Sequence, residues 1–207
     1  MTLRVSFFID GFNVYHSLRD NPNFAHLRKY RWLNYRRLCE FFLNGGKIKD
    51  LFYFTAYATW KPQGLIRHQA FVRALELHNV TPVFGKFKEK NRFCNNCRRK
   101  FNSHEEKQTD VNIAIRLFEE ALKDSYDVAV VASGDSDLVP AIRAIKRSFP
   151  HKIIKVLIPI GRRAEELKEA CSQENVMKIR ETHLKQSQFP DVVEVDGFRI
   201  EKPVEWQ

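Results

Sequence analysis

The sequence predicts an α/β fold, in which a parallel sheet of about five strands carries helices on both faces. Short runs rich in β-branched and aromatic residues alternate with stretches whose apolar residues recur every three or four positions. This alternation favours βαβ units and therefore a parallel sheet. One strand-like run, Val128 to Ala132, is apolar at every position, as burial on both faces of a sheet requires.

The predicted elements follow this order along the chain. Strands are expected at residues 5–9, 51–57, 81–84, 127–132 and 152–158. Helical periodicity occupies residues 33–43, 65–78, 110–123, 138–147 and 163–170. We therefore expect one main domain over residues 1–185, interrupted at about 86–107 by a basic hairpin or knuckle that contains two cysteines. Residues 186–207 carry strand-turn-strand signals and are expected to form a C-terminal appendage.

The composition indicates a partner and a compartment. The chain has 35 Lys and Arg against 25 Asp and Glu, a formal net charge of +10. Such an excess favours a polyanionic partner such as RNA, although some basic domains bind no polyanion. The four cysteines form no disulfide framework, and no apolar run approaches the roughly 18 residues of a membrane helix. A cytoplasmic protein without a membrane partner is expected, and the sequence is compatible with a homodimer.

Acidic residues follow two of the predicted strands. Asp10 comes directly after the first strand, and Asp135 and Asp137 follow the strand at 127–132 across a short turn. Asp110 begins a predicted helix. Each residue taken alone is more simply explained as a turn residue or a helix cap. Because the carboxyl ends of parallel strands meet at one edge, however, the four together are expected in one crevice.

Such a crevice has a definite chemistry. Several carboxylates within a few ångströms repel one another unless a cation lies between them, and oxygen ligands suit Mg²⁺ or Mn²⁺. A cation held there can activate water and neutralise the charge that develops on a phosphodiester.

Three motifs then resemble a known family in their order along the chain. These are Phe8-Ile-Asp-Gly-Phe-Asn13, Lys107-Gln-Thr-Asp-Val111 and Ser133-Gly-Asp-Ser-Asp-Leu-Val-Pro140. Together they are similar to the NYN domain, a branch of the PIN-like nuclease superfamily, over about residues 3 to 160. The resemblance implies a Rossmann-like, PIN-like sheet and a metal-dependent endoribonuclease-type site.

The resemblance also implies roles for single residues. Asp10 and Asp135 would be the principal metal ligands, and Asp110 and Asp137 would bind directly or through water. Asn13 would orient the substrate or a metal-bound water. Ser133 and Ser136 would assist at the carboxylates or at the substrate.

The segment at 86–107 has two features of its own. Cys94 and Cys97 have the spacing of half a zinc site, for which His104 is the nearest third ligand, although a metal-free pair explains the spacing equally well. Arg98, Arg99 and Lys100 are interleaved with phenylalanines, a combination that suits RNA but also a solvated surface. Cys171, His78 and His151 are further candidates for a zinc ligand.

The leading prediction is a metal-dependent ribonuclease. One alternative is an RNA-binding or regulatory module whose acidic pocket holds a metal but turns over little. A second is a phosphohydrolase that acts on small phosphorylated molecules, although the missing second acid after Asp10 counts against its aspartyl-phosphate type.

Overall fold

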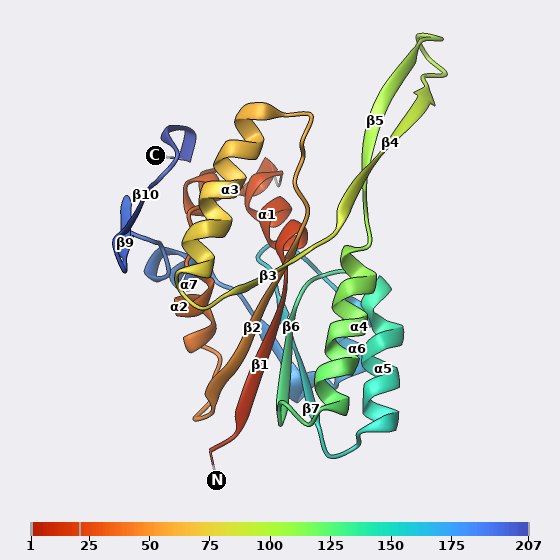
Figure 1. Cartoon of the computed structure of the whole chain (residues 1–207). Coiled ribbons are helices and arrows are strands. Elements are labelled where there is room, and N and C mark those ends of the chain that lie inside the picture. The colour runs from red at the N-terminus through yellow and green to blue at the C-terminus, as the bar shows by residue number, and fades with distance from the viewer. Residues whose placement is uncertain (1, 21, 207) are drawn as a thin grey trace.

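The computed structural model describes residues 2–20 and 22–206 and contains a six-stranded sheet whose neighbouring strands are all parallel (Figure 1). The predicted α/β class is confirmed, and the sheet has one short strand more than expected. In sheet order the strands are β3 (Thr81–Phe84), β2 (Lys47–Thr55), β1 (Arg4–Asp10), β6 (Val128–Ala132), β7 (Ile153–Ile158) and β8 (Val176–Lys178).

Helices cover both faces of this sheet (Figure 1). One layer contains α1 (Gly11–Arg19), α2 (Tyr35–Glu40), α3 (Pro62–Glu76) and α7 (Glu181–Gln186). The other layer contains α4 (Thr109–Leu122), α5 (Val139–Ser148) and α6 (Glu165–Cys171). Short 3-10 helices at Pro22–Tyr30, Ser136–Leu138, Gln173–Asn175 and Val204–Trp206 complete the connections.

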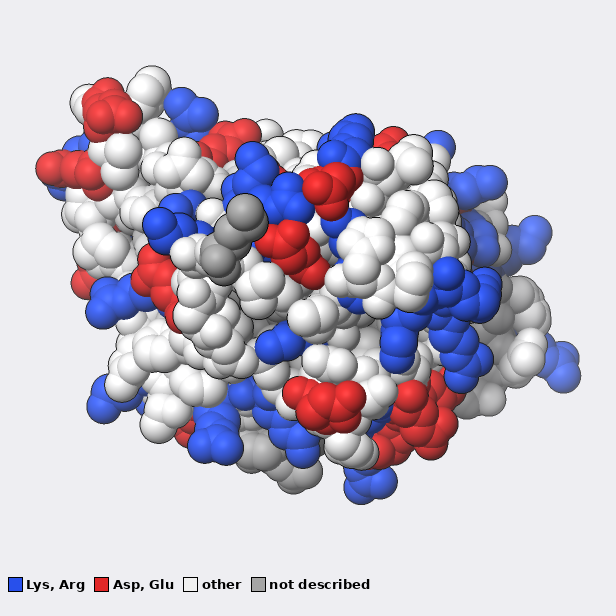
Figure 2. Space-filling model, turned by 90° about the horizontal axis from the view of Figure 1, so that it is seen from below, with Lys and Arg blue, Asp and Glu red and all other residues white. Residues whose placement is uncertain are grey.

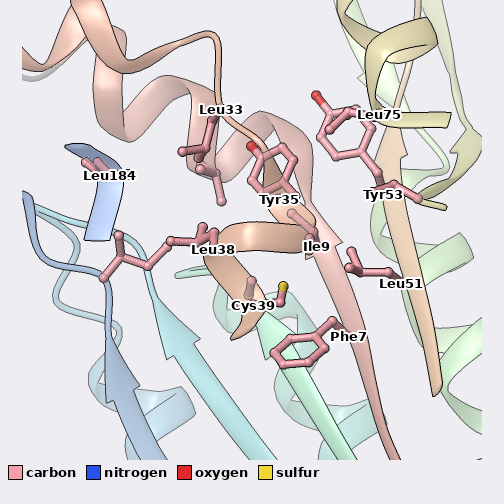
Figure 3. Close-up of a cluster of buried hydrophobic side chains, with 14 of the residues drawn as sticks. Phe7, Ile9, Leu33, Tyr35, Leu38, Cys39, Leu51, Tyr53, Leu75 and Leu184 are labelled. Atoms are coloured by element: carbon pink, nitrogen blue, oxygen red, sulfur yellow. The ribbon is translucent and has the colours of Figure 1, made fainter. Parts of the chain in front are cut away.

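The two cores follow from the alternation of side chains along each strand. In β1, Phe7 and Ile9 join the core beneath α2 and α3, whereas Phe8 joins the core beneath α4 and α5. Figure 3 shows the first of these cores, where Phe7 and Ile9 point toward Cys39 and Tyr35 of the α2 segment. Burial of both faces explains why β1 is almost continuously apolar.

The order of strands places two loops side by side. β1 lies between β2 and β6, and Ile9 pairs with Ala132 at the carboxyl ends of β1 and β6. Asp10 and Ser133, the residues that come next, are therefore neighbours although 123 positions separate them. Gly11 is required at this point, because a Cβ there would lie 2.6 Å from the Tyr53 ring.

An antiparallel hairpin projects away from the body between β3 and α4 (Figure 1). It consists of β4 (Lys86–Phe93) and β5 (Lys100–Lys107). Because side chains alternate, Lys86, Lys88, Lys90 and Arg92 share one face of β4, and Phe87 and Phe93 lie on the other. Residues 86–107 hold eight basic and three acidic residues, a net charge of +5 that is half of the chain's total.

The C-terminal segment returns to the body. β9 (Val192–Val195) and β10 (Phe198–Glu201) form a second antiparallel hairpin near α3 (Figure 1). After it, Trp206 is buried with its ring centroid 6.1 Å from that of Trp32 and 5.6 Å from that of Phe71. Residues beyond position 186 thus contribute to the core of the α2 and α3 layer.

The face at the amino ends of the strands carries charges of both signs. Figure 2 shows it from below, with Lys and Arg interspersed among Asp and Glu and no extended area of one sign. Arg4 forms ion pairs here with Asp124 at 3.2 Å and Asp127 at 2.6 Å. The basic excess of the chain is therefore not concentrated on this face. Among the described residues, no helix combines the length and apolar character needed to cross a bilayer.

Candidate acidic site at the carboxyl edge of the sheet

Asp10 is the most deeply placed acid of the site. Its side chain is 4% exposed at the end of β1. Oδ1 accepts the backbone N–H of Asn13 at 2.9 Å, so Asp10 is the N-cap of α1, and Oδ2 accepts the hydroxyl of Ser133 at 2.7 Å. Both carboxylate oxygens keep a further lone pair for another ligand.

Two polar side chains tie the β1 and β6 loops together. Asn13 Oδ1 accepts the backbone N–H of Gly134 at 2.9 Å. The Ser133 hydroxyl, which donates to Asp10, also accepts the N–H of Asp135 at 3.1 Å. Ser133 is fully buried, so it holds Asp10 and the following loop in place and cannot contact a substrate from solvent, contrary to one of the roles predicted for it.

Asp135 and Asp137 lie on the loop that follows Ser133. Asp135 caps the 3-10 helix at Ser136–Leu138 by accepting the N–H of Asp137 at 3.0 Å, which leaves its Oδ2 outside this bond. Asp137 and Ser136 are exposed. No hydrogen bond from Ser136 to a carboxylate occurs among the described residues. Asp135 therefore has a structural role, and this role does not prevent its Oδ2 from binding a metal.

Asp110 reaches the same crevice from the first turn of α4. The preceding Gln108 adopts a left-handed conformation with φ of 80°, which is costly for a residue other than glycine. Glu106 stands beside it and accepts both the backbone N–H and the hydroxyl of Thr109. This local geometry turns the chain from β5 into α4 and brings Asp110 near enough to Asp135 and Asp137 for their charges to raise its pKa.

Burial and the neighbouring charges raise two pKa values in the site. Burial raises the pKa of Asp10 from 3.8 to about 6, with smaller contributions from the charges of Asp110 and Asp135, while its hydrogen bonds oppose the shift. Partial burial, followed by the charges of Asp135, Glu106 and Asp137, raises the pKa of Asp110 to about 6. Both acids are thus destabilised as anions, which is the electrostatic condition that a bound cation relieves.

The donor set fits a hydrated divalent cation. The available atoms are hard carboxylate oxygens, which suit Mg²⁺ or Mn²⁺. Among the described residues, no three His, Cys, Asp or Glu side chains converge closely enough to enclose an ion. Mg²⁺ usually binds through one or two carboxylates and keeps several waters, so an open arrangement of this kind suits it better than Ca²⁺. Asp10 and Asp135 would provide the direct ligands.

An aromatic cleft lies beside the acids, at the base of the hairpin. It encloses about 670 Å³, and its aromatic lining consists of Tyr57, Trp60, Phe84, Phe87 and His104. Trp60 and His104 stack with their ring centroids 3.6 Å apart and their planes 9° apart. Phe87 contacts Trp60 on one side and Phe12 on the other. Because Phe12 is two residues after Asp10, the cleft adjoins the acidic crevice.

The structure separates the three residues predicted to bind zinc. Cys94 and Cys97 lie at the tip of the hairpin, whereas His104 pairs with Glu89 near its base. Five residue steps along β4 correspond to roughly 16 Å, far beyond the reach of one ion. The prediction that His104 completes a site with this pair is therefore corrected. Arg98, Arg99 and Lys100 are exposed at the same tip, away from the acids.

Sequence reasoning overlooked two residues of this region, Glu106 and Trp60. Glu106 belongs to the acidic group, but the sequence shows it only as one charge in a mixed segment. Trp60 is in the loop before α3, and only the fold brings it to the hairpin. Arg162 follows β7, and its Cβ lies 3.0 Å from the position that a Cβ on Gly134 would take. The sequence does indicate Arg162, because it is a basic residue that closely follows the strand predicted at 152–158.

The fold and the crevice define a Rossmann-like α/β domain with an acidic site at the carboxyl edge of its sheet. The chain belongs to the NYN domain family, whose model matches residues 4–178 and whose members are generally nuclease-like. Among solved structures, the chain is similar to a protein of unknown function from Vibrio parahaemolyticus, with 16% identity and a TM-score of 0.61. That match covers 87% of this chain and 94% of the other and supports the fold alone. No curated protein matches the chain.

Proposed function

We propose that the protein is a metal-dependent endoribonuclease that hydrolyses RNA phosphodiester bonds at the crevice around Asp10. The observation that carries the proposal is the gathering of Asp10, Asp110, Asp135 and Asp137 at one sheet edge, with the pKa of Asp10 and that of Asp110 both raised to about 6. A structural role alone does not call for burying acidic side chains close to one another's charges. NYN family membership supports a nuclease-like activity for the site.

The roles of the acids follow from their surroundings. Asp10 and Asp135 are proposed as direct ligands of Mg²⁺ or Mn²⁺, and Asp110 and Asp137 as ligands of its hydration shell. The cation supplies an acidified water and a counter-charge for the phosphate. Asn13 and Ser133 position the two loops through their hydrogen bonds to Gly134 and Asp10.

The surroundings of the crevice support RNA as the substrate. Single-stranded RNA is bound by aromatic rings that stack on bases together with cations that contact phosphates. The aromatic cleft offers the rings of Trp60 and Phe87 together with Lys86, which also lines it, whereas Lys88 and Lys90 lie on the opposite face of β4 from Phe87. An RNA strand lying in the cleft would pass from the base of the hairpin toward the acids.

Circular and linear RNA of the same sequence test the proposal. Purified protein is incubated with each in Mg²⁺, in Mn²⁺ and in EDTA. Cleavage of the circle that requires either metal and is lost in Asp10→Asn is the expected result. Cleavage of the linear form alone would show an exonuclease. Binding without cleavage in either metal would support the alternative of an RNA-binding module.

A further inference from the structure

The tip of the β4–β5 hairpin carries two cysteines with the spacing of half a zinc site. Cys94 and Cys97 are both free thiols in a tight turn at the tip. The turn is closed by Arg98 N–H donating to Cys94 O at 2.8 Å and by Cys94 N–H donating to Arg99 O at 2.9 Å. Arg98 takes a left-handed conformation with φ of 53° to close it. This geometry places both sulfurs at one end of the hairpin.

The turn also favours the ionised form of Cys94. The backbone N–H groups of Cys97 and Asn96 and the side chain of Cys97 lower the pKa of the Cys94 thiol. Donors arranged in this way favour a thiolate, which is the form that binds Zn²⁺. A loop that only reverses the chain has no need of a non-glycine residue in the left-handed conformation that Arg98 adopts.

The described part of the chain offers no further ligands to this pair. A closed structural zinc site has four ligands, and the turn offers two. His104 is roughly 16 Å away along the strands, and Cys39 and Cys171 are buried in the two cores. Within residues 2–20 and 22–206, no three side chains of the ligating types come together. The missing two ligands must come from outside this chain.

We propose that a second copy of the chain supplies them, so that one Zn²⁺ on a twofold axis is bound by Cys94 and Cys97 of each copy. A twofold contact is self-complementary, so a half-site with two ligands becomes a tetrahedral site with four. The hairpin places its tip roughly 23 Å beyond its first residue pair, which leaves room for two tips to meet without a clash between the bodies.

The surroundings of the pair suit this contact. Phe93 is 55% exposed and Phe101 is 49% exposed, and they lie on opposite faces of the hairpin next to the tip. Two tips that meet would cover these rings. A zinc ion with four thiolates carries a charge of −2, which Arg98, Arg99 and Lys100 of both copies offset at short range.

Zinc titration of the full chain tests the proposal. Untagged protein is stripped of metal, kept under a reductant, and titrated with Zn²⁺ while its mass is followed by light scattering and bound zinc by elemental analysis. We expect the mass to double at half a zinc per chain and EDTA to reverse the change. Cys94→Ser and Cys97→Ser should each abolish both effects. Asn95→Ser, in the same turn, and His104→Ala should retain both.

Each other outcome overturns the proposal. One zinc per monomer would mean that water or another residue of the chain completes the site. No zinc bound, or zinc bound equally by Cys94→Ser, would remove the cysteine pair as its ligand. A dimer that survives EDTA but is lost on reduction would be a disulfide. Thermal melts of all variants verify that the body is folded, as expected for changes at an exposed tip.

Discussion

Replacing Asp10 with Asn removes one negative charge from the crevice at nearly constant shape. Asn is as good an N-cap as Asp, so the start of α1 is retained. Its Oδ1 can still accept the N–H of Asn13. Its NH₂ group faces Ser133 Oγ, which must then turn its own proton elsewhere, at a cost of about 1 kcal/mol.

At neutral pH, the stability gained by removing the Asp10 charge is larger than this cost. The pKa of Asp10 is raised from 3.8 to about 6, and each pH unit corresponds to about 1.4 kcal/mol. The ionised carboxylate therefore destabilises the fold by about 3 kcal/mol. The net gain from Asp10→Asn is about 1–2 kcal/mol, or about 2–8 °C in Tm for a chain of this size.

The gain depends on pH with a definite sign. Because the folded state holds the Asp10 proton more tightly than the unfolded state, wild-type stability falls as pH rises from about 4 to about 6. The advantage of Asp10→Asn should therefore be complete above pH 7 and absent near pH 4. Asp127→Asn is the matched control. The pKa of Asp127 is lowered to about 2 by Arg4, so this variant should be less stable than wild type at pH 7.

The response to Mn²⁺ and the cleavage of RNA test the same variant further. Melts at pH 7.5 with and without Mn²⁺ should show wild type and Asp127→Asn stabilised by the ion, by about 2.7 kcal/mol at a hundred times Kd, and Asp10→Asn much less. RNA cleavage should fall at least about a hundredfold in Asp10→Asn. If Asp10→Asn melts below wild type, keeps its Mn²⁺ response and still cleaves RNA, Asp10 is only a helix cap and the proposed site is wrong.

Three further predictions concern the hairpin, the cleft and the loop after β1. Replacing Arg98, Arg99 and Lys100 together with Ala should reduce the slope of log K for RNA binding against log salt concentration by roughly two to three units, measured by fluorescence anisotropy. An unchanged slope would show that these charges do not contact RNA. Trp60→Ala should weaken single-stranded RNA binding by about five- to 150-fold, since a stacked base contributes roughly 1–3 kcal/mol. Phe41→Ala, which removes another aromatic ring stacked on a histidine, His183, should leave RNA binding unchanged. Equal losses of RNA binding in the two variants would show that the cleft around Trp60 does not bind RNA specifically. Gly11→Ala should lower the urea unfolding free energy by about 1–3 kcal/mol, because its Cβ has no room beside Tyr53 and Phe54 O, and wild-type stability would contradict this packing.

Patterns that repeat along the chain were sufficient for most of the sheet. β6 is apolar at all five positions because it lies in the middle of the sheet and is covered on both faces, so its sequence admits few other structures. β8 has three residues at the edge, too few to show any period. α1 was not predicted for two reasons. Its start depends on a cap by Asp10, and Val14 and Leu18 are the only large apolar residues of this helix that are buried.

The polar details of the site depend on which strands are neighbours. Parallel strands were enough to predict that Asp10 and Asp135 share an edge. The adjacency of β1 and β6 was not predicted, and without it nothing connects Asn13 with Gly134 or Ser133 with Asp10. The grouping of His104 with Cys94 was wrong for a related reason. Closeness in sequence ceases to mean closeness in space once two strands of a hairpin run antiparallel for eight residue pairs.

The position of the hairpin follows from the topology of the sheet. β3 ends at the carboxyl edge, and α4 begins at that edge with Asp110 in its first turn. Any segment inserted between them must leave and re-enter the body beside the acids. Gly85 marks the point of contact, since a Cβ there would lie 2.7 Å from Lys107 O and 2.8 Å from the Thr109 hydroxyl. The close approach of these two ends holds the base of the hairpin, with Phe87 and His104, against the crevice, whereas its tip remains free to meet a partner.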